Sequence, residues 1–297
     1  MMQNRPSVPV TTIGGYLGSG KTTLVNHLLR NANGRKLAVL VNEFGDLPID
    51  EDLIEAQDET LISIAGGCIC CSFGNDLIGA LRDMLGGPTV PDQILIETSG
   101  VAIPSAIVAT VSLLTGLHSD ASLVVVDAET VRTAARDDYI GDTITRQLSD
   151  ADIVVVNKQD QVSDTAAKQE LADWLSDVAP RSVILPTEFG RVAPDAIFGC
   201  VAEPSHGLTA HHSDALFESI TLHPDPIEDV ANYVHRLITE NRGIVRAKGY
   251  VYDMMDQCWL IQVVGQRSNV SRSDQAKQNG LVCIGLRGRC DFSGLRP

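Results

Sequence analysis

Apolar runs recur through the first two thirds of the chain and alternate with segments of helical periodicity. Several runs are continuously apolar, which is typical of strands buried on both faces of a parallel sheet. Alternating strands and helices indicate an α/β fold with a doubly wound, mostly parallel sheet. The pattern predicts helices at 21–31, 75–85, 104–114, 141–149 and 165–179. It predicts strands at Val8–Ile13, Leu37–Val41, Leu61–Ile64, Gln93–Ile96, Leu123–Val126, Ile153–Val156 and Val183–Leu185.

The pattern changes near residue 194, where Pro, Gly, Ser and His mix without clear periodicity. Such a stretch is typical of a linker, and we place it at 196–213, between domains at 1–195 and 214–297. The second domain is expected to be a smaller α+β domain. Its predicted elements are a strand at 216–222, a helix at 226–240 with one apolar face, and strands near 245–252, 258–264 and 281–287.

Composition and charge exclude several kinds of partner. The 297 residues contain 23 Lys and Arg against 38 Asp and Glu, for a formal net charge of −15. An acidic chain without a basic block is poorly suited to bind nucleic acid or an anionic membrane. No run of 18 apolar residues predicts a membrane-spanning helix, and the N-terminal residues lack a signal- or transit-peptide pattern. We therefore expect a cytoplasmic protein whose seven cysteines are thiols.

A glycine-rich loop follows the first predicted strand and precedes the first predicted helix. Gly15, Gly20, Lys21 and Thr22 fit the pattern G-x-x-x-x-G-K-[S/T] in this context. In such a loop backbone N–H groups surround the phosphates, the lysine reaches the β- and γ-phosphates, and the hydroxyl ligates Mg²⁺. The loop predicts a P-loop NTPase, with Lys21 and Thr22 in catalytic roles.

Two further motifs follow in order. QILIETSG ends a strand at Glu97, where a carboxylate close to Mg²⁺ is expected, and Gly100 can offer its N–H to the γ-phosphate. In DIVVVNKQD, Asp160 can accept from guanine N1–H and the exocyclic amine together, a pair that adenine lacks. The three motifs predict a GTP-binding protein rather than an ATPase. Neither an arginine finger nor a glutamine stands near ETSG in the sequence, so we expect slow intrinsic turnover.

GGCICCSFGND places three cysteines within four positions, at Cys68, Cys70 and Cys71. Alternate residues of an extended segment share one side and adjacent residues diverge, so the three sulfurs do not easily surround one ion. The spacing favours an incomplete metal site with a further ligand from elsewhere, which suits a metal that must leave. Thiolates favour Zn²⁺, with Co²⁺ and Cu(I) as alternatives. Core packing, a redox pair and a catalytic thiol are the other interpretations.

Taken in order, GGYLGSGKTT, NEFGDLPID, GGCICCSFGND, ETSG and NKQD resemble the CobW family of metal-handling GTPases. These are relatives of the nickel-insertion GTPases for hydrogenase and urease. The resemblance covers the predicted GTPase domain, and RAKGYVY is similar to the family's second domain. It implies a metallochaperone that binds Zn²⁺ or Co²⁺, hydrolyses GTP with Mg²⁺, and transfers the metal to a client metalloprotein.

The resemblance also assigns residues. It implies that the cysteines of CxCC ligate the metal and that Glu43, in NEFG, lies near the Mg²⁺ or the transferred metal. Our own hypothesis is a switch, in which GTP and Mg²⁺ order the NEFG segment and bring Glu43 toward the cysteines, and GTP hydrolysis releases the metal. The implied nucleotide-binding residues are Gly15, Gly18, Ser19, Gly20, Lys21, Thr22, Thr23, Asn75, Asn157, Lys158 and Asp160.

The chain departs from the family in two places. A Leu-Pro step follows Asp46, which puts a ligand role for Asp46 in doubt, and the usual His-rich run is reduced to His206, His211 and His212. Two rival functions remain, a redox-sensing GTPase and a non-enzymatic metal buffer with structural GTP; a nucleotide kinase is a weaker third. The sequence leaves open the physiological metal, the client and the oligomeric state, a nucleotide- or metal-dependent dimer included.

Overall fold

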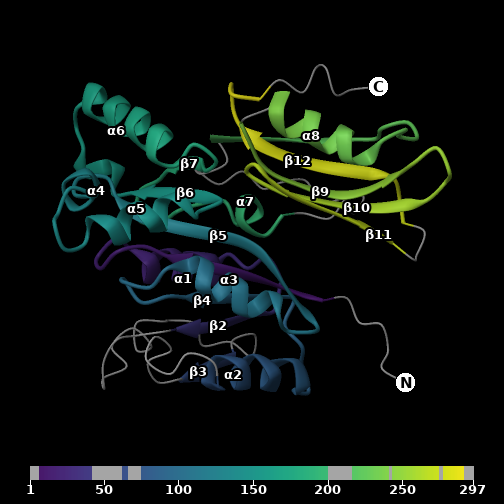
Figure 1. Ribbon diagram of the computed structural model, residues 1–297, viewed down its shortest axis with the longest axis horizontal. Coiled ribbons are helices and arrows are strands. Elements are labelled where there is room, and N and C mark those ends of the chain that lie inside the picture. The colour runs from purple at the N-terminus through teal and green to yellow at the C-terminus, as the bar shows by residue number, and fades with distance from the viewer. Residues whose placement is uncertain are drawn as a thin grey trace. The chain divides into compact units, whose positions relative to one another are not determined.

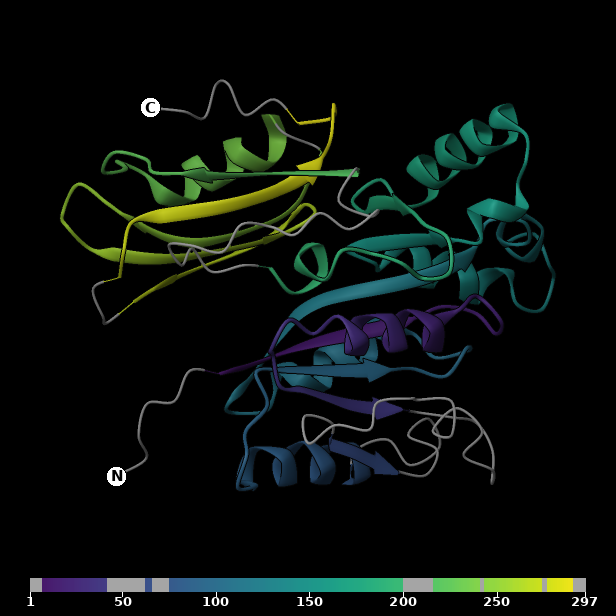
Figure 2. The same ribbon diagram turned by 180° about the vertical axis from the view of Figure 1, so that it is seen from behind.

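A computed structural model describes residues 7–41, 62–65, 75–199, 216–240, 243–273 and 277–290. The chain divides into two units, Met1–Val192 and Ala193–Pro297. The elements of both units are labelled in Figure 1, and Figure 2 shows the same ribbon from behind. Among the described residues, no helix combines the length and apolarity that a membrane span requires.

The first unit is built on a seven-stranded sheet whose paired strands all run parallel. The order is β3-β2-β4-β1-β5-β6-β7, so the chain builds outward from β1 on one side, returns with β4, and continues on the other. The predicted doubly wound parallel sheet is confirmed. The strands are β1 (Val8–Gly14), β2 (Leu37–Val41), β3 (Ile62–Ala65), β4 (Gln93–Glu97), β5 (Leu117–Asp127), β6 (Ile153–Asn157) and β7 (Val183–Pro186).

Helices bury the sheet of the first unit. Successive residues Ile94, Leu95 and Ile96 of β4 are all fully buried, so both faces of this strand are covered. One core cluster packs α2 and α3 against β1, β2 and β4, and another packs α4, α5 and α6 against β5 and β6. The helices are α1 (Lys21–Arg30), α2 (Asn75–Gly86), α3 (Pro104–Ser112), α4 (Val131–Ala134), α5 (Gly141–Ser149) and α6 (Thr165–Val178).

The strand register aligns the ends of four neighbouring strands. Ala65 of β3 pairs with Val41 of β2, Val41 pairs with Glu97 of β4, and Glu97 pairs with Ile13 of β1. These four residues lie at one level near the carboxyl edge of the sheet. In sheets of this topology, ligands bind outside the carboxyl ends of the strands at the point where the strand order reverses.

Strand β5 is longer than its apolar run predicts. It begins at Leu117, six residues before the predicted start, through the polar segment around Asp120. The register against β1 shifts here, because Val10 pairs with Ser119 and Thr11 with Ala121, which leaves Asp120 as the extra residue of a β-bulge. The bulge accommodates polar residues that an apolar-run criterion rejects.

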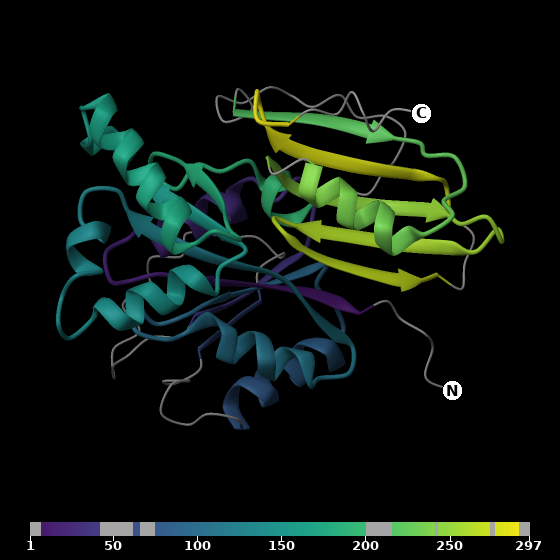
Figure 3. The same cartoon turned by 45° about the horizontal axis from the view of Figure 1, so that its top comes forward.

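The second unit is a five-stranded sheet in the order β11-β10-β9-β12-β8, and every pairing in it is antiparallel. Figure 3 shows α8 (Val230–Glu240) lying across one face of this sheet. Val230, Val234 and Leu237 carry the apolar face of α8 into the core of the unit. The strands are β8 (Phe217–Leu222), β9 (Ile244–Tyr252), β10 (Cys258–Val264), β11 (Arg267–Arg272) and β12 (Gly280–Leu286).

Two predicted boundaries in the second unit are wrong. Helix α8 begins at Val230, four residues after the predicted start, because the Ile227 N–H donates to Tyr252 O of β9 in an isolated bridge. Asp229 instead accepts from Asn232 N at 3.0 Å, within the first turn of α8. The predicted linker at 196–213 begins too early, since Pro194–Phe198 forms the short helix α7, whose last three residues are buried. Positions 200–213 lie outside the described residues.

Candidate nucleotide-binding site

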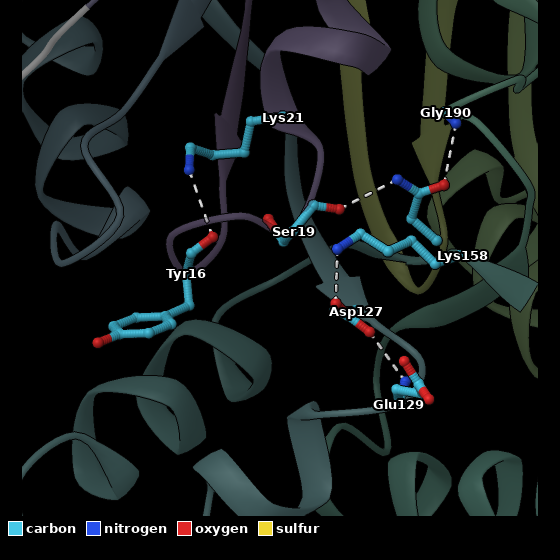
Figure 4. A network of polar contacts seen from close by, with 8 residues as sticks. Tyr16, Ser19, Lys21, Asp127, Glu129, Lys158 and Gly190 are labelled. Atoms are coloured by element: carbon cyan, nitrogen blue, oxygen red, sulfur yellow. Dashed lines mark hydrogen bonds and ion pairs between the residues drawn. The ribbon is translucent and has the colours of Figure 1, made fainter. Parts of the chain in front are cut away.

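The glycine-rich loop connects β1 to α1 at the centre of the parallel sheet. Ser19 N donates to Tyr16 O at 3.2 Å inside the loop, and Leu24 N donates to Gly20 O at 3.0 Å where the helix begins. The Lys21 side chain turns back over the loop, and its Nζ donates to Tyr16 O at 3.4 Å (Figure 4). Lys21 is only 8% exposed, so its ammonium group is held close to the loop backbone.

Two positions of the loop require glycine. Gly15 has φ 131°, and a Cβ there would meet the backbone oxygen of Val125 in β5. Gly20 has φ 99°, and a Cβ there would meet Nδ2 of Asn157. Positive φ is costly for residues with a Cβ. Both glycines therefore let the loop approach the ends of neighbouring strands closely.

A buried carboxylate stands beside the start of α1. Thr22 Oγ1 donates to Glu97 Oε1 at 2.9 Å, and Glu97, the last residue of β4, is 2% exposed. The sequence predicted that Thr22 ligates Mg²⁺ and that Glu97 lies close to the same ion, and the structure brings the two side chains together. A hydroxyl and a carboxylate are the oxygen donors that Mg²⁺ prefers.

The asparagine of the NKQD motif joins two loops. Asn157 Nδ2 donates to Ser19 O at 3.0 Å, and Asn157 Oδ1 accepts from Gly190 N at 2.9 Å. Gly190 lies in the segment after β7 and packs so closely on α1 that a Cβ there would be 2.8 Å from Leu24 N. Asn157 is 2% exposed, so these two bonds are shielded from water. Its amide ties the glycine-rich loop to the segment after β7.

Lys158 and Asp160 of NKQD differ in their partners. Lys158, with φ 60°, forms an ion pair from Nζ to Asp127 Oδ2 at 2.7 Å, and Asp127 is the last residue of β5. Asp127 Oδ1 also accepts from Glu129 N at 2.9 Å. Asp160, in a 3₁₀ turn at Gln159–Gln161, is exposed and has no recorded partner among the described residues. Its carboxylate is accessible to a ligand at this edge.

The segment after Glu97 packs on the glycine-rich loop. A Cβ on Gly100 would be 2.8 Å from Leu17 N, so the two backbones are in contact. Ala102 N donates to Ser99 O at 3.1 Å and closes a turn around Gly100. Gln147 of α5 donates to the carbonyls of Gly100 and Ala102, although the sequence showed no glutamine near ETSG. Gln147 is therefore distant in sequence but adjacent in the fold.

Part of the predicted site is not described. Glu43, Cys68, Cys70 and Cys71 lie outside the described residues, as do His206, His211 and His212. Asn75 is the first residue of α2, where a helix was predicted to begin after the cysteines. No group of three or more His, Cys, Asp or Glu suited to a metal occurs in the parts of the chain that are described. The predicted metal site therefore rests on the sequence.

Three residues at this edge were missed by the sequence analysis, namely Asp127, Gln147 and Gly190. Asp127 ends an apolar run in the same way as Glu97, and this signal could have found it. Gln147 bonds to backbone carbonyls of another segment, and the Gly190 N–H donates to the side chain of Asn157. No local sequence pattern marks such residues.

The fold and the loop define a P-loop nucleotide-binding protein, with the loop at the strand-order switch and Lys21 and Thr22 at the start of α1. A family model described as "CobW/HypB/UreG, nucleotide-binding domain" matches residues 9–186. The chain belongs to this family, which confirms the resemblance inferred from the motifs.

Curated relatives extend the similarity over both units. The chain is 30% identical to a "Zinc chaperone CobW" of Pseudomonas aeruginosa, over 96% of this chain and 89% of the relative. It is 28% identical to a protein of the same name from Sinorhizobium sp., over 95% and 94% of the two chains. It is also 32% identical to "Zinc-regulated GTPase metalloprotein activator 1" of Schizosaccharomyces pombe, over 62% of this chain and 47% of that protein.

Proposed function

We propose that the protein is a GTP-hydrolysing metallochaperone, which binds a transition metal at CxCC and transfers it to a client metalloprotein under control of GTP. The observation that carries the proposal is the convergence of three motifs at one edge of the sheet. Thr22 bonds to Glu97, and Asn157 bonds to the Ser19 carbonyl, although these residues come from three separate segments. The names of the curated relatives add zinc chaperone and metalloprotein activator functions.

Each catalytic residue has a role that fits its position. Lys21 neutralises charge on the β- and γ-phosphates, and Gly100 offers its N–H to the γ-phosphate. Thr22 and Glu97, whose oxygens lie 2.9 Å apart, would hold Mg²⁺. Held there, Mg²⁺ would supply positive charge that offsets the charge developing on the phosphates. Gly15, Gly18, Ser19, Gly20 and Thr23 complete the backbone cradle for the phosphates.

The NKQD segment selects guanine. The exposed Asp160 carboxylate accepts from two guanine donors, while Asn157 and Lys158 set the position of the segment through Ser19, Gly190 and Asp127. A site built for a paired hydrogen bond rejects a base that lacks the pair. The side-chain bonds of Asn157 and Lys158 hold the NKQD segment, and with it Asp160, in place before the nucleotide binds.

The strand register supports coupling between the metal motif and the nucleotide. Ala65, Val41 and Glu97 lie at one level on adjacent strands, which are spaced about 4.8 Å apart. Cys68 is three residues beyond Ala65 and Glu43 is two beyond Val41, and a residue spans at most about 3.6 Å. The chain length therefore allows Cys68 and Glu43 to reach the edge that holds Glu97. Asn75, the first residue of α2, is a further nucleotide-binding residue in this proposal.

The switch follows from this placement. GTP with Mg²⁺ orders the NEFG segment and brings Glu43 toward CxCC, which tightens the metal shell. Hydrolysis removes the γ-phosphate contacts and releases the metal. Thiolates from Cys68, Cys70 and Cys71 suit Zn²⁺ best, with Co²⁺ as the alternative.

The test is the affinity for Zn²⁺ and for Co²⁺ by competition with a chelating dye. It is measured without nucleotide, with Mg²⁺–GDP, and with Mg²⁺ and a non-hydrolysable GTP analogue. We expect the analogue to raise Zn²⁺ affinity about 10-fold or more, the scale of a coupling between two sites. The double variant Cys70→Ser, Cys71→Ser should lose this site. Affinity that is weak and indifferent to nucleotide would overturn the proposal and favour a redox role for the cysteines.

A further inference from the structure

A side chain of α5 holds the turn that follows β4. Gln147 Nε2 donates to Ala102 O at 2.7 Å and to Gly100 O at 3.2 Å. Ser99 O accepts from Ala102 N at 3.1 Å, so Gly100 and Val101 are the central residues of a turn. Gln147 is 1% exposed, so water does not compete for its amide. One buried amide therefore clamps two carbonyls of this turn.

The clamped turn is in contact with the glycine-rich loop. The position of a Cβ on Gly100 would fall 2.8 Å from Leu17 N and within 2.9 Å of the Leu17 side chain. A cavity of about 30 Å³ is lined by Leu17 and Gln147, among others. The Gln147 side chain and the glycine-rich loop therefore line one cavity.

We propose that Gln147 is a positioning residue for the γ-phosphate. A peptide unit is planar, so holding Gly100 O fixes the plane that joins Gly100 to Val101. The backbone dihedrals of Gly100 are thereby restrained. In the proposed function, on which this inference rests, the Gly100 N–H meets the γ-phosphate. GDP has no γ-phosphate. Gln147 therefore contributes to binding of GTP and not of GDP.

The test compares affinities for GDP and for a non-hydrolysable GTP analogue, both with Mg²⁺, in the full chain. In Gln147→Leu we expect the ratio of the analogue Kd to the GDP Kd to rise about 10-fold over that of the wild-type protein, the scale of one lost hydrogen bond. Gln147→Met keeps the length of the side chain without the donor and carries the test if the leucine variant does not fold. A thermal melt of each variant checks folding.

Gln93 provides the matched control. It is 3% exposed in the same unit, and its Nε2 donates to Thr11 Oγ1 at 2.8 Å, but it lies at the opposite end of β4 from Glu97. Gln93→Leu should lower the melting temperature and leave the Kd ratio unchanged. A ratio that is equally unchanged in both Gln147 variants would overturn the inference alone. Failure of the wild-type protein to bind either guanine nucleotide would overturn the proposed function itself.

Discussion

The two units bury their polar groups in different ways. In the first unit, Lys21, Glu97 and Asn157 are buried at the carboxyl edge of a parallel sheet, where loops meet them. In the second unit, Tyr233 of α8 and Cys283 of β12 lie among apolar side chains, and burial raises the pKa of each to about 12. The first arrangement brings polar groups together where loops meet, and the second keeps Tyr233 and Cys283 neutral. Burial of a polar group indicates function only where loops are arranged around it.

The largest effect should come from removing the positive charge of Lys21 in the glycine-rich loop of the first unit. Lys21→Ala should reduce kcat/KM for GTP by about 100-fold or more, because a preorganised charge on the phosphates is lost. Lys36→Ala is the matched control, since Lys36 is exposed just before β2. A steady-state phosphate-release assay measures both variants. Full activity in Lys21→Ala would show that the glycine-rich loop of the first unit does not take part in GTP hydrolysis.

The next largest effect is expected for Asp160, the exposed carboxylate that accepts from guanine in the proposed function. In Asp160→Asn the carboxylate becomes an amide, which can donate to the extra carbonyl of xanthine but loses an acceptor for guanine. We expect GTP affinity to fall about 100-fold and affinity for xanthosine triphosphate to rise. Asp164→Asn is the control, because Asp164 caps α6 through Ala166 N and asparagine caps equally well. Unchanged base preference in Asp160→Asn would show that NKQD does not read the base.

A smaller effect is expected from removing the Asn157 amide, which joins the glycine-rich loop to the segment after β7. Asn157→Ala removes the bonds to Ser19 O and Gly190 N, which should cost about 2 kcal/mol of unfolding free energy. Asn157→Asp keeps the acceptor for Gly190 N but places a carboxylate oxygen against Ser19 O in a buried site, so a loss at least as large is expected. Guanidinium denaturation measures stability, and nucleotide titration measures binding. Wild-type stability in both variants would show that the two side-chain bonds of Asn157 do not stabilise the fold.

The smallest effect concerns the reactivity of the thiols of Cys283 and Cys290 in the second unit. Burial is the main cause that raises the pKa of Cys283 to about 12 and the pKa of Cys290 to about 11. Iodoacetamide at pH 8 should therefore leave both thiols unmodified in the folded protein, because the thiolate is the nucleophile. Both should react after unfolding, as peptide mass spectrometry can show. Rapid modification in the folded state would mean that these groups are not kept neutral by packing.

The same shifts in pKa predict a pH dependence with a definite sign. The folded state holds the thiol protons of Cys283 and Cys290 more tightly than the unfolded chain does. Their contribution to stability is complete below the ordinary thiol pKa. It is lost as the pH rises toward about 11 and about 12, where the folded thiols ionise.

The elements buried on both faces were the most predictable from sequence. The runs that form β2, β4 and β6 are continuously apolar, and their ends fall within one residue of the prediction. Strand β11 was missed because RSNVSR is polar and mostly exposed along its length. The start of β5 was missed because a β-bulge at Asp120 admits polar residues. Apolar periodicity reports burial, so it cannot find elements that are solvated or interrupted.

The site was predictable where residue type carries the chemistry. Lys21, Thr22 and Glu97 were found because a phosphate loop and a strand-end carboxylate have local signatures. Gln147 and Gly190 were missed because their partners, the Gly100 carbonyl and the Asn157 side chain, lie far along the chain. Such contacts depend on how the strands are ordered in the sheet, and the local sequence around either residue does not encode that order.

In the proposed function, the metal motif and the nucleotide are coupled through one edge of the sheet. The most direct measurement is the Kd of a non-hydrolysable GTP analogue with and without saturating Zn²⁺, in the wild-type protein and in the Cys70→Ser, Cys71→Ser variant. Coupling between two sites is reciprocal, so Zn²⁺ should tighten analogue binding by the same factor by which the analogue tightens Zn²⁺ binding. The variant should show no such change. An analogue Kd that is unaffected by Zn²⁺ in the wild-type protein would contradict the account.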